Sequence, residues 1–164
     1  MKGCIYRTYG RKFKNFILII GIFVIISAGL NSCCTKMYCP GADDMGPIEF
    51  LNFSSDETDD VFLVYYSKDS DFKMVVDSFP LEIHPVSEGD KFYGYSPLNI
   101  AVEYDYRLYF TLIEKVYSIS EFQTGKSVCN DCFLSKDYYT SMDAYKINGN
   151  LKNSHILQVD KLTD

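Results

Sequence analysis

The stretch VEYDYRLYFTL, Val102–Leu112, decides the fold, because apolar and polar residues alternate along its whole length. One set of alternate positions is apolar: Val102, Tyr104, Tyr106, Leu108, Phe110 and Leu112. The positions between them carry mostly polar side chains: Glu103, Asp105, Arg107, Tyr109 and Thr111. Successive side chains of a β-strand point to opposite faces, so this period of two predicts a strand with one buried face.

Short β-prone segments separated by turn-forming residues lie on both sides of this strand. They are PIEFLNF (47–53), VFLVYY (61–66), FKMVVDSF (72–79), VYSISEFQT (116–124), AYKING (144–149) and SHILQVDK (154–161), with LEIHPV (81–86) as a weaker candidate. VFLVYY is apolar on both faces, as expected for a central strand or a contact surface. INGN (147–150) predicts a tight turn between strands. Only CNDCFLSKDYYTSMDAY (129–145) leaves room for one or two turns of helix.

About seven strands in about 115 residues predict an all-β fold, a single immunoglobulin-like β-sandwich. The chain contains no Trp, so the Cys, Trp and Cys spacing of true immunoglobulin domains is missing. The prediction therefore concerns the architecture alone. A length of 164 residues, 47% of them hydrophobic, fits one such domain preceded by a leader.

Charge is distributed unevenly along the chain. Five of the 16 basic residues precede Phe16, whereas all 22 acidic residues follow it, beginning at Asp43. The part of the chain after Phe16 therefore has a net charge of −11. Phosphate backbones would repel such a surface, so we expect no nucleic-acid binding.

The N-terminal segment has the layout of an export signal. A basic start is followed by an apolar run over 16–30 and then by small residues. About 15 apolar residues form about 22 Å of helix, whereas a span of the bilayer core needs roughly 20 residues. The run is therefore short for a permanent span, and we expect a cleaved helical signal peptide.

Leu30-Asn31-Ser32-Cys33, at the end of this run, resembles the lipobox of bacterial lipoproteins. In that family the cysteine receives a diacylglyceryl group, signal peptidase II cleaves before it, and the new N-terminus is usually acylated. The resemblance implies that Cys33, rather than Cys34, is the lipidated residue. Two or three acyl chains hold a protein stably on a bilayer, because each buried CH₂ contributes ~0.8 kcal/mol. An uncleaved anchor and an ordinary secreted protein remain alternatives.

The lipobox resemblance implies a signal peptide over 1–32. The composition that follows predicts a flexible tether over 33–47 and a β-sandwich over 48–164. The tether is rich in the turn-forming residues Pro and Gly. In outline the chain resembles the small uncharacterised β-sandwich lipoproteins of diderm bacteria. That resemblance implies a location in the cell envelope, with the outer membrane favoured and the domain in the periplasm or at the cell surface.

Four cysteines besides Cys33 would remain in the mature chain: Cys34, Cys39, Cys129 and Cys132. An even number in an oxidising compartment predicts disulfides, and three pairings are possible. The stretch CNDC (129–132) also has the C-x-x-C spacing of thiol oxidoreductases. Together the four thiolates could hold zinc. The disulfide interpretation is favoured, and the redox and metal interpretations stay open.

Catalytic and ligand-binding signatures are absent from the sequence. His84 and His155 lie in no metal-ligand spacing, and we interpret them as surface residues. SSDETDD (54–60) could offer carboxylates to calcium but does not match an EF-hand loop, so an acidic turn is favoured. The 14 Tyr and 12 Phe are many for this length. They favour an aromatic sandwich core, with a face that binds sugar, peptide or protein as the alternative.

These patterns predict a non-enzymatic envelope lipoprotein without a cofactor. It would contact the lipid bilayer through its acylated N-terminus and bind an unknown protein or polysaccharide partner. The alternative is a tethered thiol-redox or metal-handling protein that uses Cys129 and Cys132.

Overall fold

The computed structural model describes residues 39, 41–86, 91–131 and 136–164. The chain divides into two compact units, one of Tyr38–Val128 with Tyr138–Asp164 and the other of Met1–Met37 with Cys129–Asp137. The first unit holds the packed β-sheets. The predicted signal peptide and lipobox lie outside the described residues, as do positions 33–38 and 40 of the predicted tether. The described tether residues 41–47 pack against the sandwich: Met45 is 4% exposed, and its N–H donates to the Ile100 carbonyl at 2.8 Å.

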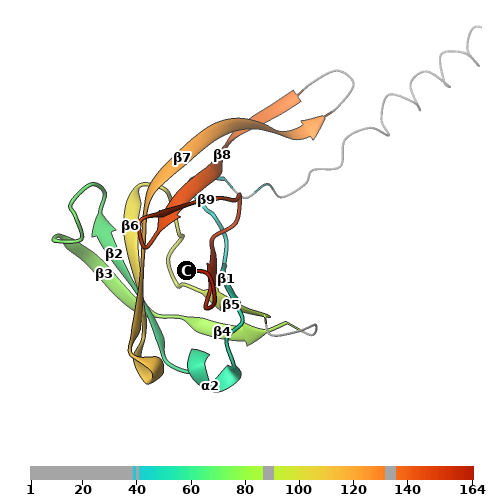
Figure 1. Ribbon diagram of the computed structural model, residues 1–164. Coiled ribbons are helices and arrows are strands. Elements are labelled where there is room, and N and C mark those ends of the chain that lie inside the picture. The colour runs from blue at the N-terminus through green and yellow to red at the C-terminus, as the bar shows by residue number, and fades with distance from the viewer. Residues whose placement is uncertain (1–38, 40, 87–90, 132–135) are drawn as a thin grey trace, which may run out of the picture. The chain divides into compact units, whose positions relative to one another are not determined.

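Two β-sheets make up the sandwich (Figure 1). The four-stranded sheet has the order β10-β1-β5-β4 and consists of β1 (Ile48–Leu51), β4 (Glu82–Pro85), β5 (Lys91–Tyr95) and β10 (Gln158–Asp160). The six-stranded sheet has the order β3-β2-β6-β7-β8-β9. Its strands are β2 (Val61–Ser67), β3 (Val75–Pro80), β6 (Tyr104–Phe110), β7 (Lys115–Asp131), β8 (Lys136–Ile147) and β9 (Asn150–Asn153). Strand β1 is parallel to β10 and antiparallel to β5.

The predicted all-β sandwich is confirmed, with ten described strands instead of about seven. Two short strands, β5 and β9, were not predicted. The weak candidate segment LEIHPV contains β4. The possible helix within 129–145 is wrong for the described part from Lys136 onward, because β8 occupies it between β7 and β9. The structure resembles immunoglobulin domains only in that it has two packed β-sheets.

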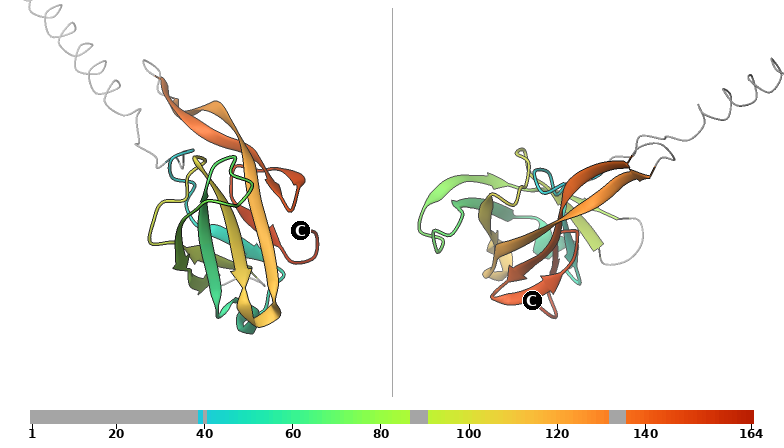
Figure 2. Two further views of the ribbon diagram at one scale, coloured as in Figure 1. Left: turned by 90° about the vertical axis from the view of Figure 1, so that its left-hand side faces the viewer. Right: turned by 90° about the horizontal axis from the view of Figure 1, so that it is seen from above.

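The stretch that predicts the fold forms β6 at the centre of the larger sheet (Figure 2, left). Tyr106, Leu108 and Phe110 are buried as the alternation predicts. Phe110 contacts Phe50 of the opposite sheet edge to face, with ring centroids 5.4 Å apart, and stacks on Phe53 at 4.7 Å. The strand ends there, and Leu112 in the 3-10 turn η1 (Thr111–Ile113) is 59% exposed. The alternation therefore fails at Leu112, where the backbone is no longer extended.

Buried tyrosines fasten chain segments through their hydroxyl groups. Tyr106 donates to the carbonyl of Ala101 at 2.6 Å and accepts its N–H at 2.8 Å. Tyr145 makes the same two contacts with Gln158. Burial raises the pKa of Tyr106 above its usual value and the pKa of Tyr145 to about 12. Both hydroxyls are therefore neutral donors at physiological pH, and the aromatic content serves structure at these positions.

The acidic stretch SSDETDD forms the one-turn helix α2 (Ser55–Thr58). The N–H of Ser54 donates to Glu57 at 3.0 Å, and Lys161 lies 2.6 Å from the other oxygen of that carboxylate. The contacts with Lys161 and with the Ser54 backbone lower the pKa of Glu57 from 4.5 to about 2. Glu57 thus ties the helix to the residues that follow β10.

We expect Glu57→Gln to lower the melting temperature near neutral pH and to lose this effect in acid. The pKa of Glu57 is depressed in the folded state, so its contribution is complete above pH 4.5 and disappears as the pH falls towards about 2. Thermal melts of both proteins between pH 7 and pH 2 measure the difference. Lys161→Met should reproduce the same pH dependence, and a difference that stays constant down to pH 2 would contradict the prediction.

Candidate binding surface

A groove of about 380 Å³ lies beside strand β3. It is lined by Tyr65, Val76, Asp77, Pro97, Leu98, Asn99, Glu103 and Tyr104. Tyr65 belongs to β2, and its hydroxyl donates to the carbonyl of Leu98 at 3.1 Å and lies 2.7 Å from Ser96 Oγ. These bonds hold the connection between β5 and β6 next to the β2–β3 hairpin, and so they fix one wall of the groove.

A second cleft, of about 680 Å³, shares Glu103 with the groove. It is lined by Cys39, Gly41, Ala42, Asp43, Ala101, Val102, Glu103, Tyr139 and Thr140. Backbone hydrogen bonds build it: Ala42 N–H donates to the Thr140 carbonyl, and Val102 N–H donates to the Ala42 carbonyl, both at 2.8 Å. Glu103 therefore stands between two concave surfaces.

The charged side chains that line these two surfaces are all acidic. They are Asp43, Asp77 and Glu103. Within the described ranges none of the three forms an ion pair with a basic side chain. Uncompensated carboxylates in a concave surface concentrate cations, so this region favours a positively charged ligand group.

Large apolar side chains are exposed next to the groove. Met74, Val75 and Val76 are exposed by 63%, 61% and 50% and are consecutive in the chain, and Leu98 across the groove is 47% exposed. β3 is also a terminal strand of its sheet. An exposed apolar edge strand is unusual in a soluble domain because it invites pairing with another chain.

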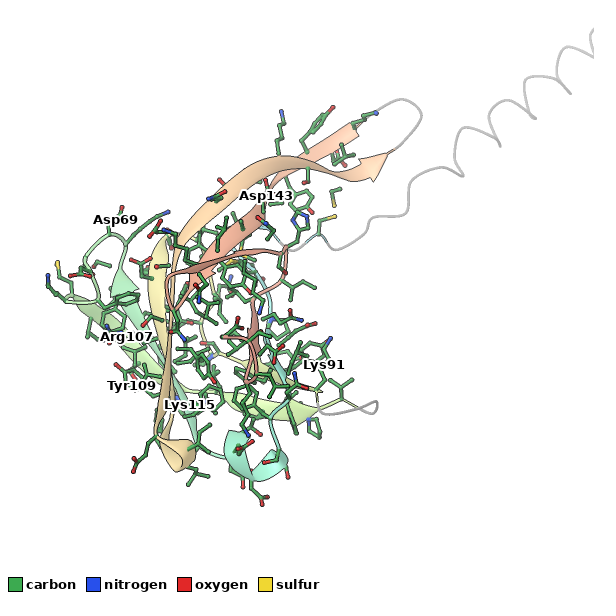
Figure 3. The ribbon with its side chains drawn as sticks, in the orientation of Figure 1. Asp69, Lys91, Arg107, Tyr109, Lys115 and Asp143 are labelled. Atoms are coloured by element: carbon green, nitrogen blue, oxygen red, sulfur yellow. The ribbon has the colours of Figure 1, made fainter. Side chains whose placement is uncertain are left out.

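The loop that leads into β3 is held by an aromatic cluster around Arg107 on the outer face of the six-stranded sheet (Figure 3). The guanidinium lies over the ring of Phe72 at 4.5 Å and the ring of Tyr66 at 5.7 Å. The Tyr66 and Tyr109 hydroxyls are 3.2 Å apart. The hydrogen bond with Tyr66 is the main cause that lowers the pKa of Tyr109, and Arg107 adds to it.

Backbone strain in this loop explains why it needs such support. Asp69, Asp71 and Phe72 all have positive φ, between 53° and 59°, which costs energy for residues other than glycine. Asp105 accepts the N–H of Asp69 at 3.0 Å, and burial raises the pKa of that carboxyl. The cluster therefore positions the start of β3, and its cation is already covered by its own aromatic rings.

A serine, aspartate and histidine group lies on β8 and in the connection between β9 and β10. Ser141 donates to Asp143 at 2.9 Å, and His155 Nδ1 is 3.6 Å from the same carboxylate and 2.7 Å from the Met142 carbonyl. Nucleophilic catalysis needs the imidazole next to the serine hydroxyl. In this group the carboxylate stands between the two, so the arrangement does not activate Ser141.

Both histidines lie at the surface, as the sequence predicts. His84 is exposed and lies 3.1 Å from Glu82, and His155 is exposed as well. Across the part of the chain that the structure describes, no three metal-binding side chains come together. Tyr65 lines the groove and Tyr139 the second cleft, whereas Tyr95 packs edge to face against His84 and Tyr138 lies under the Lys126 ammonium, both at the surface.

Two of the candidate disulfide residues are described, and both are oxidised. Cys39 and Cys129 are disulfide-bonded. Cys34 and Cys132 lie outside the described residues, so the pairing stays a prediction, as does the redox alternative. Zinc binding by all four thiolates would require Cys39 and Cys129 to be reduced. Cys33, the predicted lipidation site, also lies outside them. Among the described residues there is no helix long and apolar enough to cross a membrane.

Comparison with known protein families, curated proteins and solved structures finds no match to this chain. A functional assignment therefore depends on the geometry above. Sequence reasoning identified FKMVVDSF as a strand but missed the groove, whose lining comes from β2, β3, β6 and the β5–β6 connection. The run of Met74, Val75 and Val76 gave no signal of a binding surface, because consecutive apolar residues in a strand ordinarily indicate burial.

Proposed function

We propose that the chain is a membrane-anchored envelope lipoprotein that is not an enzyme and that binds a partner protein through the groove beside β3. The observation that carries the binding proposal is the coincidence of two features at one place. The exposed apolar side chains of Val76 and Leu98 line a concave surface that also holds Asp77 and Glu103. An apolar area with a charged rim is the composition of many protein interfaces.

Anchoring is supported by the lipobox resemblance of Leu30-Asn31-Ser32-Cys33. We expect Cys33→Ala to abolish metabolic labelling with a fatty acid and to leave an unprocessed precursor. The matched change Cys34→Ala should do neither, because Leu30 and Ser32 have the lipobox spacing only relative to Cys33. Gel mobility and lipid labelling in intact cells measure both effects. Equal labelling of the two variants would refute the assignment.

Binding at the groove can be tested with a photocrosslinking amino acid at Leu98 in intact envelopes. We expect discrete protein adducts from this position and their loss when Val76→Asp is introduced. Leu162, which is 76% exposed, provides the matched control position. Adducts that form equally at both positions, or at neither, would contradict partner binding at the groove.

A further inference from the structure

Among the described parts of the two sheets, β3 is the longest terminal strand. β3 has six residues, whereas the other terminal strands, β4, β9 and β10, have four or fewer. Its described partner is β2 alone, in a register from Phe62 opposite Pro80 to Tyr66 opposite Val75. The other edge of β3 therefore presents a row of backbone N–H and C=O groups suited to one more strand.

The side chains of β3 divide between the two faces of the sheet. Asp77 stands opposite Tyr65, whose ring lines the groove, and so Asp77 faces the groove as well. The register shifts between Tyr65 and Tyr66, so Val76 is the extra residue of a β-bulge. Val75, on the other side of the bulge, stands opposite Tyr66, which contacts Arg107 on the outer face. A strand added beside β3 would in the same way direct alternate side chains towards the groove and towards the outer face.

The chemistry of the two faces selects the occupant. On the groove side, Asp77 and Glu103 are carboxylates without a basic partner among the described residues, so they favour Lys or Arg. On the outer side, the exposed Val75 favours an apolar residue. A second copy of this chain is disfavoured, because its net charge after Phe16 is −11 and two copies would repel each other.

We infer that β3 accepts an extended segment of a partner protein, with alternating basic and apolar side chains, as an additional strand of the six-stranded sheet. The basic side chains enter the groove towards Asp77 and Glu103, and the apolar ones cover Val75. This inference rests on the proposed function, because it specifies how the partner binds at the groove.

The test uses the full chain in detergent and the synthetic peptide acetyl-Lys-Val-Lys-Val-Lys-Val-amide. We expect binding that slows amide hydrogen exchange in β3, and no binding of the peptide with Glu in place of Lys. Two further peptides carry N-methyl groups on all Val amides or on all Lys amides. In a strand at the edge of a sheet, only alternate residues direct their N–H and C=O groups towards the neighbouring strand. N-methylation of those residues should therefore abolish binding, and N-methylation of the residues between them should leave binding unchanged.

Variants of the protein locate the site. Val75→Lys should weaken peptide binding about tenfold, which corresponds to ~1.4 kcal/mol. Leu151→Lys is the matched control, since Leu151 is 52% exposed on the terminal strand β9, and it should leave binding unchanged. Asp77→Asn should weaken binding about two- to fivefold at low salt and less at high salt, as for an exposed ion pair.

The outcomes separate this inference from the proposed function. Equal binding of both N-methylated peptides, or no binding of the Lys-Val peptide, would overturn strand addition, while crosslinks from Leu98 would still support a partner at the groove. Absence of those crosslinks would overturn the proposed function itself. Concentration-dependent self-association in the ultracentrifuge that Val75→Lys removes would assign the edge to a second copy and would also overturn the inference.

Discussion

Phe110→Ala should lower the free energy of unfolding by about 3–5 kcal/mol, the usual cost of deleting a buried aromatic ring. Phe110 is 1% exposed and belongs to the larger sheet, yet its ring contacts Phe50 of the smaller sheet and Phe53 after it. It also meets Tyr117 at 5.5 Å. Removal of the ring leaves a cavity where the two sheets meet, and these aromatic neighbours are too constrained to fill it.

Leu112→Ala is the matched control, because the alternating pattern places Leu112 on the same face as Phe110. In the structure Leu112 lies in η1 and is 59% exposed, so its truncation should change the free energy of unfolding by less than about 0.5 kcal/mol. Urea denaturation followed by circular dichroism measures both variants. Equal losses would mean that Leu112 packs into the core and that the strand continues beyond Phe110.

The elements that sequence reasoning found are those in which local pattern and tertiary packing agree. β6 alternates because one face meets the opposite sheet, and Tyr106, Leu108 and Phe110 are buried accordingly. The predicted turn INGN is present because Asn148 and Gly149 both have positive φ, of 50° and 84°, which a two-residue hairpin turn requires. Such features need only neighbouring residues, so the sequence displays them.

The unpredicted strands depend on partners that are distant in the chain. The sequence of β5, KFYGY, favours a turn because it is short and contains glycine. In the structure, however, Gly94 pairs with Ile48 on one side and with Ile83 on the other. β9 contains two Asn residues, which are poor strand formers, and it is held by pairing with β8. Local propensity alone could not predict either strand.

The candidate binding surface could not be predicted for the same reason. Val76 and Glu103 are 27 positions apart in the sequence and line one groove only because β2 pairs with both β3 and β6. No spacing rule relates such residues. The exposure of Met74, Val75 and Val76 was also hidden, because an apolar run in a strand ordinarily indicates burial.

Gly94→Ala should destabilise the protein by about 1–3 kcal/mol, as is usual when a methyl group is forced into a packed core. A β-carbon at this position would lie 2.6 Å from Phe50 Cε2 and 3.0 Å from Leu81 Cδ1. Phe50 is fully buried, and its ring is enclosed by Phe53 and Phe110. The clash therefore cannot be relieved by a small movement of one side chain.

Gly125→Ala provides the control, because its β-carbon would come even closer to a neighbour, the carboxylate of Asp143. That side chain is 45% exposed and can rotate into solvent, at the cost of its hydrogen bond with Ser141, which is about 1 kcal/mol. Both substitutions restrict the unfolded chain equally, so the difference between their unfolding free energies compares the clash at Phe50 with the loss of the Asp143 hydrogen bond.

We expect Gly94→Ala to be the more destabilising of the two, although the distance at Gly125 is shorter. Phe50→Leu in the Gly94→Ala background should recover part of the loss, because a smaller side chain opposite the new methyl group relieves the overlap. Urea melts of the two single variants and of the double variant measure this coupling. If Phe50→Leu only adds its own loss to that of Gly94→Ala, the close approach of Gly94 to Phe50 does not set the packing of β5, and another contact of that strand must do so.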